Sequence, residues 1–187
     1  MVNLVNFAVV GTSIGRFHIQ GISNLPELAH LAAVCDINET RAKEMAEKYH
    51  ADFFTTNYEE LLQRSDIDAV ILAIPHDLHR DMAVAAAKAG KHILVEKPIA
   101  MTLTQADEII AAAKVNNVKL MTGHNMRYLG QHAKAKELVE TGVIGKPYLL
   151  TATVHVYSNT KGFRTILKHM GGGSLIDSGV HRFDLIR

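Results

Sequence analysis

The sequence predicts an α/β protein, in which a doubly wound parallel sheet is followed by the beginning of a smaller α+β domain. Three observations favour this fold class. Short apolar runs alternate with helical patterns of about ten to fifteen residues, as in parallel strands joined by crossover helices. Several runs are apolar throughout, which is typical of strands buried on both faces. After Gly123 the sequence pattern changes to polar loops and one run in which apolar and polar residues alternate.

The expected elements follow one another regularly from the N-terminus. Strands are expected at residues 7–10, 31–35, 53–55, 69–74, 93–95 and 119–122. Helices are expected at residues 14–25, 38–49, 58–64, 78–89 and 102–115. Asn38 and Thr102 can cap their helices, because a side-chain oxygen at that position accepts a bond from a backbone N–H of the first turn. Such alternation implies right-handed crossovers and a sheet covered on both faces.

The C-terminal part carries a different pattern. A helix is expected at residues 131–140, and alternate residues are apolar from Tyr148 to Tyr157. That alternation indicates a strand with one buried face, as in an antiparallel sheet. Ser174 is expected to cap a last helix. The domain boundary therefore falls near Gly123, between a first domain at residues 1–123 and a partial α+β domain at residues 124–187.

Composition excludes several classes of partner. The chain has 187 residues, with 20 Lys and Arg against 19 Asp and Glu, so its charge does not steer it toward nucleic acid or an anionic membrane. Its one cysteine, Cys35, lies in an apolar run, which favours a reducing compartment. Neither a signal peptide nor a run long enough to span a bilayer is evident. We therefore expect a cytoplasmic protein.

Charge appears abruptly where the fifth expected strand ends, in Glu96-Lys97-Pro98. In open parallel sheets, ligands bind in the crevice beyond the carboxyl ends of the strands. Lys97, in a segment stiffened by proline, is therefore a candidate functional cation. A solvated lysine at the start of a loop is the competing interpretation.

The turn Gly11-Thr12-Ser13-Ile14-Gly15 joins the first strand to the first helix. Small residues at this place let backbone amides and the helix dipole face a pyrophosphate. The outer glycines of a standard dinucleotide fingerprint are five residues apart, whereas these are four apart, so the turn must be shorter or rearranged. An ordinary tight turn is the alternative.

Asp36 ends the second strand about twenty residues after the glycine turn, where a carboxylate can accept hydrogen bonds from the adenosine ribose hydroxyls. The same carboxylate would repel a 2'-phosphate, which favours NAD over NADP. Arg41 on the following helix weakens that preference, so NADP is kept as the second choice. A surface aspartate opening a loop would explain Asp36 equally simply.

The fourth strand ends in Ile74-Pro75-His76-Asp77, with His79 shortly after. These residues are candidates to line a nicotinamide pocket. Two histidines near an aspartate also suggest a metal site, but no further clustered ligand completes one, so metal binding is the less favoured alternative.

Asp177 and His181 are four residues apart in the last expected helix, so their side chains share one face. A carboxylate there can orient the imidazole and stabilise its protonated form, as proton removal from an alcohol requires. Asp184 competes for that role. An ordinary surface pair is the alternative.

Four segments together resemble one protein family. They are Asp68 to Pro75 with His79, Ala89 to Pro98, Gly142 to Pro147, and Gly171 to His181, which includes Gly-Gly-Gly-Ser-Leu-Ile-Asp-Ser-Gly-Val-His. In this order the sequence resembles the glucose–fructose oxidoreductase, inositol dehydrogenase and rhizopine catabolism (Gfo/Idh/MocA) family over essentially its whole length. The resemblance implies a Rossmann dinucleotide-binding domain, a substrate and oligomerisation domain, and an NAD(P)-dependent oxidoreductase acting on sugars, polyols or related substrates.

The resemblance also implies roles for particular residues. Lys97, Asp177 and His181 would form the active-site trio. Cofactor positions would be Gly11, Asp36, Pro75, His79 and Glu96, and Arg127 with Tyr128 would reach toward the active site. As hydride leaves the alcohol carbon, His181 would accept the hydroxyl proton while Lys97 stabilises charge on the oxygen.

The sequence departs from the family pattern soon after His181, since members normally continue into a broad antiparallel sheet. The strand at residues 148–157 would present unpaired backbone groups, and one side of the last helix would expose several large apolar residues. We therefore expect association, with a second copy as a homo-oligomer or with a further portion of the protein. The alternative function is a non-catalytic nucleotide-binding or interaction module.

Overall fold

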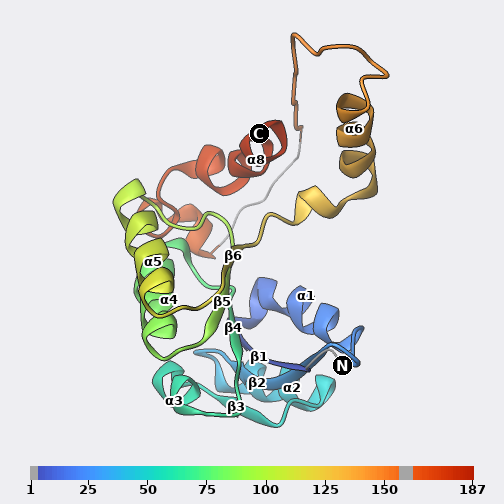
Figure 1. The fold of residues 1–187 in the computed structure, drawn as a ribbon. Helices are drawn as coiled ribbons and strands as arrows, with labels where there is room; N and C mark the ends of the chain where they lie inside the picture. The colour runs from blue at the N-terminus through green and yellow to red at the C-terminus, as the bar shows by residue number, and fades with distance from the viewer. Residues whose placement is uncertain (1–3, 156–161) are drawn as a thin grey trace.

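The computed structural model describes residues 4–155 and 162–187 and is organised around one parallel sheet (Figure 1). The order is β3-β2-β1-β4-β5-β6, with every neighbouring pair parallel. The strands are β1 (Val5–Val10), β2 (Ala29–Cys35), β3 (Phe53–Thr55), β4 (Ala69–Leu72), β5 (His92–Val95) and β6 (Leu120–Thr122). The chain switches direction across the sheet between β1 and β4, and ligands of doubly wound sheets bind at such a point. The predicted fold class is confirmed.

Two apolar layers bury the sheet because its strands are apolar on both faces. On β1, Ala8 and Val10 join one layer, whereas Val9 joins the other. The first layer is covered by α3 (Tyr58–Gln63), α4 (His79–Lys88) and α5 (Leu103–Val115). The second is covered by α1 (Thr12–Ser23) and α2 (Glu39–Tyr49).

Two predicted helix caps are confirmed. The side chain of Asn38 accepts a bond from the amide of Arg41 at 3.0 Å, and that of Thr102 from the amide of Gln105 at 3.2 Å. Ser174 behaves differently from its prediction. It already has helical dihedral angles (φ −62°, ψ −26°) and makes no side-chain cap bond, because the chain enters a π-helical turn, η4 (Leu175–Gly179), directly after it.

The C-terminal part consists of helices and helical turns that follow β6. They are η2 (Asn125–Tyr128), α6 (Gly130–Glu140), η3 (Gly162–Thr165), α7 (Leu167–Met170), η4 and α8 (Val180–Ile186). The red segment holding α8 lies above the carboxyl edge of the sheet, whereas α6 stands away from the sheet and buries none of its residues (Figure 1). Among the helices described, none is both long and apolar enough to cross a membrane.

The strand predicted at residues 148–157 is wrong for the part described. Residues 148–155 form no strand and are exposed. A strand of this kind needs a neighbour to bond its backbone groups, and the described parts of the chain offer it none. Residues 156 and 157 lie outside the described ranges.

Candidate active site

Lys97 lies just beyond the carboxyl end of β5, and Asp177 of the π-helical turn comes to it from far along the chain. The Lys97 Nζ donates to the Asp177 Oδ1 at 2.8 Å and to the Asp177 main-chain oxygen at 2.6 Å. Both side chains are largely buried, being 15% and 18% exposed. Burial alone would raise the pKa of Asp177, but the hydrogen bond and charge of Lys97, assisted by Arg164, lower it. Asp177 is therefore ionised near neutral pH.

Asp177 holds Lys97 and not the imidazole for which the sequence predicted it. Its Oδ2 accepts a bond from the Nε of Arg164 at 3.2 Å, and its Oδ1 lies 3.7 Å from the Nε2 of His76. Within the described residues no hydrogen bond joins Asp177 to His181. Cations form stronger hydrogen bonds with a carboxylate than a neutral imidazole does, so Asp177 pairs with Lys97 and Arg164.

His181 lies in α8, only 9% exposed, with its ring near Lys97. Burial lowers the pKa of His181, and the positive charges of Lys97, His124 and Arg182 lower it further, against a smaller opposing effect of Glu96. A lowered pKa keeps the ring neutral near pH 7. A neutral imidazole can accept a proton, so His181 is suited to act as a base.

The glycine turn brings backbone close to backbone at the end of β1. Gly11 has φ +85°, and a Cβ there would lie 2.3 Å from the carbonyl oxygen of Ala73. At Gly15 a Cβ would lie 2.8 Å from the Cγ1 of Val9, so this glycine lets α1 pack closely on the sheet. The helix begins at Thr12, directly after the turn, so the turn is short, as the four-residue spacing predicts. This cradle fits a dinucleotide phosphate, which needs close backbone approach to a helix N-terminus.

We expect Gly11→Ala to lower the free energy of unfolding by about 1–3 kcal/mol, because the new Cβ meets a carbonyl oxygen and the positive φ disfavours alanine. Urea unfolding followed by circular dichroism measures the change. The matched control is Gly21→Ala in α1, where nothing lies within 4 Å of the new Cβ. It should be neutral or stabilising by up to about 1 kcal/mol. Equal stability of the two variants would contradict the role given to Gly11.

Asp36 lies where the sequence predicted it, beyond the end of β2, but its oxygens already have partners. The amide and hydroxyl of Thr12 donate to its Oδ2 at 2.8 and 2.5 Å, and the amide of Asn38 donates to its Oδ1 at 2.9 Å. Arg41 also reaches Oδ1, at 3.3 Å. Burial would raise the pKa of Asp36, but the bonds from Thr12 and Asn38 and the charge of Arg41 lower it. Asp36 thus fixes the glycine turn as a charged carboxylate.

The other predicted cofactor positions gather around this turn. The Ile74 side chain lies against Gly11, and Pro75 follows it at the start of the turn η1 (His76–Leu78). The ends of β1, β2 and β4 bring together Gly11, Thr12, Ser13, Ile14, Asp36, Ile74 and Pro75.

His79 is placed differently from its prediction as a residue lining the nicotinamide pocket. It is fully buried, with Nδ1 2.7 Å from the carbonyl oxygen of Pro98 and Nε2 3.0 Å from that of Ile74. Burial lowers the pKa of His79 despite these two acceptors, so the neutral ring donates to one of them at a time. His79 thus links the segments that follow β4 and β5 inside the protein. Because its side chain is fully buried, it cannot contact a cofactor at the surface.

The neighbouring residues His76 and Asp77 are covered by α7. The Nδ1 of His76 lies 3.2 Å from the carbonyl oxygen of Met170, and His169 donates from Nδ1 to the Asp77 Oδ2 at 2.6 Å. The C-terminal segment is therefore fastened onto the end of β4 beside the Lys97–Asp177 pair. Of these two residues, only His76 also approaches Asp177.

Glu96 points toward α1. His18 donates from Nε2 to its Oε1 at 2.7 Å, and the amide of Lys97 donates to its Oε2 at 3.2 Å. Burial opposes ionisation, but His18 and Lys97 lower the pKa of Glu96. Gly123 leaves room for this carboxylate, since a Cβ there would lie 3.2 Å from it. Sequence reasoning missed His18, because only the folded chain brings α1 beside the residue after β5.

Arg127 ties two segments of the C-terminal part together and is not directed at the glycine turn. Its Nε and Nη2 donate to the two carboxylate oxygens of Asp184 at 2.6 and 2.5 Å. The sequence had allowed Asp184 to orient His181. Both of its carboxylate oxygens instead accept hydrogen bonds from Arg127. The pair borders a cavity of about 230 Å³, also lined by Met121, Thr122, His124 and Tyr128.

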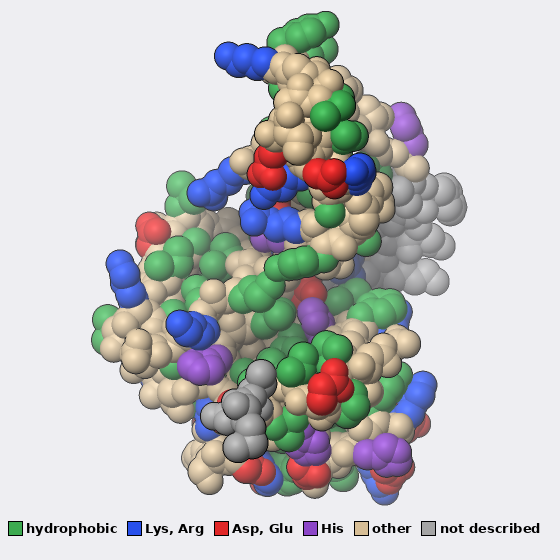
Figure 2. All heavy atoms as spheres, turned by 45° about the vertical axis from the view of Figure 1, so that its right-hand side comes forward, with side chains coloured by type: hydrophobic (Ala, Val, Ile, Leu, Met, Phe, Trp, Pro, Cys, Tyr) green, Lys and Arg blue, Asp and Glu red, His purple; other side chains and the backbone are tan. Residues whose placement is uncertain are grey.

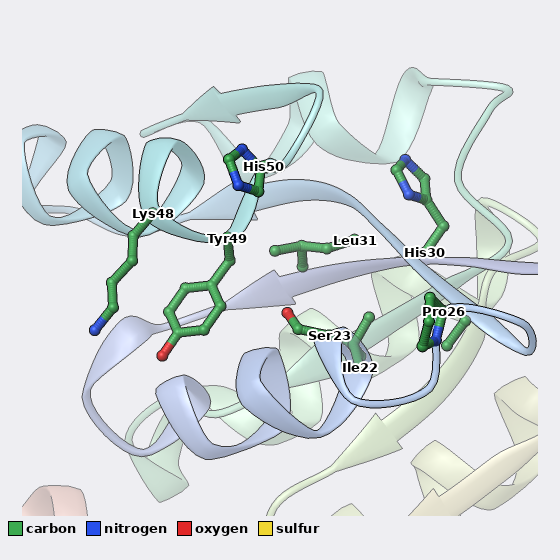
Figure 3. Close-up of a pocket in the computed structure, with 9 residues that line it drawn as sticks. Ile22, Ser23, Pro26, His30, Leu31, Lys48, Tyr49 and His50 are labelled. Atoms are coloured by element: carbon green, nitrogen blue, oxygen red, sulfur yellow. The ribbon is translucent and has the colours of Figure 1, made fainter.

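A larger hollow, of about 380 Å³, lies at the opposite edge of the sheet, where β2 begins. Figure 3 shows Ile22 and Ser23 from the end of α1 on one side and Tyr49 from the end of α2 on the other, with Leu31 between them. None of the predicted site residues lines it. The candidate site residues instead gather at the carboxyl edge.

A parallel sheet with a phosphate cradle at β1 and a carboxylate after β2 is the arrangement of a dinucleotide-binding Rossmann domain, and a lysine, a carboxylate and a histidine gather at the same edge. Comparison with known proteins agrees. A family model described as "Oxidoreductase family, NAD-binding Rossmann fold" matches residues 5–124, and the "GFO/IDH/MocA C-terminal domain" matches residues 132–187. The chain belongs to the Gfo/Idh/MocA oxidoreductase family.

Individual relatives give the same result. The chain is 36% identical to "Uncharacterized oxidoreductase YrbE" of Bacillus subtilis, over 93% of this chain and 50% of that protein. It is 32% identical to "Myo-inositol 2-dehydrogenase" of Thermotoga maritima, over 98% of this chain and 54% of the relative. The chain spans about half the length of these relatives.

Solved structures are similar throughout the chain. An NAD-binding protein from Listeria innocua superposes with a TM-score of 0.89 at 30% identity, covering 97% of this chain and 53% of that one. Levoglucosan dehydrogenase in complex with NADH and levoglucosan gives a TM-score of 0.86 at 26% identity, covering 99% and 53%.

Proposed function

We propose that this protein is an NAD-dependent oxidoreductase that transfers a hydride between a nicotinamide cofactor and a hydroxyl-bearing carbon of a sugar, polyol or related substrate. The observation that carries the proposal is the Lys97–Asp177 contact of 2.8 Å beside the buried ring of His181, at the ligand-binding edge of the sheet. Relatives named for myo-inositol and levoglucosan oxidation support the substrate class.

Gly11, Thr12, Ser13 and Ile14 would hold the cofactor phosphates, with Asp36 beyond them at the ribose. Arg41 beside Asp36 keeps NADP as the second choice. When bound, the nicotinamide supplies the hydride acceptor or donor.

The chain's own residues would manage the proton and the charge. His181, neutral at pH 7, accepts the proton of the substrate hydroxyl. The ammonium of Lys97 stabilises the negative charge that grows on the oxygen. Asp177 fixes Lys97 in place by accepting two hydrogen bonds from its Nζ, one at Oδ1 and one at the main-chain oxygen.

The setting of the site is part of the proposal. We place the boundary between the cofactor-binding and C-terminal domains near Gly123, which the two family matches on either side support. We also propose a cytoplasmic location. Burial, followed by the charges of Asp36 and Glu60, raises the pKa of the Cys35 thiol to about 11, so the thiol is inert, as suits a reducing compartment.

The test is an NADH titration of the chain followed by nicotinamide fluorescence, then an assay of myo-inositol and levoglucosan with NAD. We expect binding and turnover of at least one polyol or sugar in a wider panel. Absence of NADH binding would overturn the proposal. Tight binding without turnover would instead favour a non-catalytic nucleotide-binding module.

We expect the chain to associate, as a homo-oligomer or with a further portion of the protein. Large apolar side chains remain exposed on the last helical segment, among them Leu175, Phe183 and Ile186. Further exposed apolar residues follow α6, namely Val143, Ile144, Tyr148 and Leu149. Figure 2 shows apolar side chains in green at the upper tip of the molecule. Sedimentation velocity measures the assembly. A monomer at all concentrations, with these segments ordered, would contradict the expectation.

A further inference from the structure

Two histidines of the C-terminal part lie next to each other, and one buried nitrogen of each ring has no hydrogen-bond partner among the described residues. His124 follows β6 and His181 lies in α8, and their ring centroids are 6.0 Å apart with the planes nearly perpendicular at 85°. Across the described ranges, the Nδ1 atoms of both rings are buried and have no hydrogen-bond partner. Burying an unpaired nitrogen is unfavourable, so two such atoms at adjacent rings call for an explanation.

Cations lie mostly beside the inner ring, His181, whereas a carboxylate lies beside the outer ring, His124. His181 is surrounded by Lys97 and Glu96 from the segment after β5, by Arg182 of α8, and by His124. On its outer side, the Nδ1 of His124 lies 4.0 Å from the Oδ2 of Asp184. Asp184 is fixed there by the two bonds from Arg127. A proton leaving His181 would thus move away from the Lys97 ammonium and toward a carboxylate.

Solvent can reach His124, the outer of the two rings. His124, Arg127 and Asp184 line the cavity of about 230 Å³, which has room for several waters, and the His124 side chain is 24% exposed. The inner ring, His181, is only 9% exposed and is not among the residues that line this cavity.

We propose that His124 is a proton-relay residue, which receives the proton that His181 takes from the substrate and passes it to solvent beside Asp184. This inference rests on the proposed function. The hydroxyl O–H bond breaks and an N–H bond forms on one nitrogen of His181, while the carbon's hydride leaves to NAD. The N–H bond on the other nitrogen then breaks as its proton moves through one water to His124. His124 releases a proton to the cavity water, and both rings end neutral.

The first test is an NMR titration of the histidine side chains in the full chain without cofactor. We expect His124→Phe to move the His181 titration to higher pH, because the charge of the neighbouring His124 lowers the pKa of His181 and is lost in the variant. The matched control is His30→Phe, at the far edge of the sheet, which should leave His181 unchanged. An identical His181 titration in the wild type and in His124→Phe would overturn the proposal. His124→Gln serves as the second variant if the phenylalanine variant does not fold.

The second test is turnover of the polyol that the wild type oxidises fastest. We expect His124→Phe to lower kcat about tenfold or more while NADH affinity stays unchanged, since positioned proton transfer contributes about 10²–10⁴-fold and water can replace part of it. Free imidazole should restore part of the rate in His124→Gly, whereas His30→Phe should keep the wild-type rate with or without imidazole. Unchanged kcat in His124→Phe would overturn the relay alone. A wild type that does not turn over would instead count against the proposed function.

Discussion

Replacing Lys97 with methionine is expected to lower kcat/KM by about 10²–10³-fold, the loss typical of removing one group that stabilises an oxyanion. Methionine keeps an unbranched side chain of similar length but removes the ammonium that lies 2.8 Å from Asp177. The loss should fall mainly on kcat, because the charge matters most when the substrate oxygen becomes negative. Steady-state kinetics at saturating NAD measures it.

Removing Lys97 also leaves the largely buried Asp177 with Arg164 and His76 as side-chain neighbours, which lowers stability. The double variant Lys97→Met with Asp177→Asn separates the two effects, since it removes both charges together. Its stability should recover relative to Lys97→Met, whereas its activity should stay low. A single variant with kcat/KM within twofold of the wild type would show that Lys97 takes no part in the chemistry.

Replacing His181 with asparagine is expected to lower kcat by about 10²–10⁴-fold, the range for general acid–base catalysis. It should also change the pH profile. The base must be neutral to accept a proton, and burial followed by the charge of Lys97 lowers the pKa of His181 from its ordinary 6.5. Wild-type kcat/KM should therefore fall only as pH drops below 6.5, through this lowered pKa. The variant should lack that acid limb.

The control for this prediction is His30→Asn, whose ring lies at the opposite edge of the sheet and pairs with Asp52. It should keep both the rate and the acid limb. An acid limb that persists unchanged in His181→Asn would assign the titration to another group and remove His181 from the base role.

Most of the fold could be predicted because its signals are local. The apolar runs that form β4 and β5 are continuous. Asn38 caps α2 and Thr102 caps α5, as their residue types indicate. The strand expected at residues 148–157 fails in its described part, because an alternating pattern shows a face to bury and does not show whether a neighbour is there to bury it.

The candidate site was predictable in its members and less so in its contacts. Lys97, Asp177 and His181 come together as the family resemblance implied. The partner of Asp177 could not be deduced from the four-residue spacing, because Lys97 and Arg164 reach it from elsewhere in the chain. His79 shows the same limit: its position at a strand end suggested a ligand contact, whereas two main-chain carbonyls hold it inside.

A crystal structure of the chain with NADH is the measurement that bears most directly on the assignment. The nicotinamide ring should lie beyond the carboxyl ends of β4 and β5, with its C4 facing a space that both the Lys97 ammonium and the His181 imidazole can reach. An ordered nicotinamide that lies away from Lys97 and His181, or a complex in which these two side chains can no longer contact one small molecule, would contradict the catalytic assignment even with the nucleotide bound.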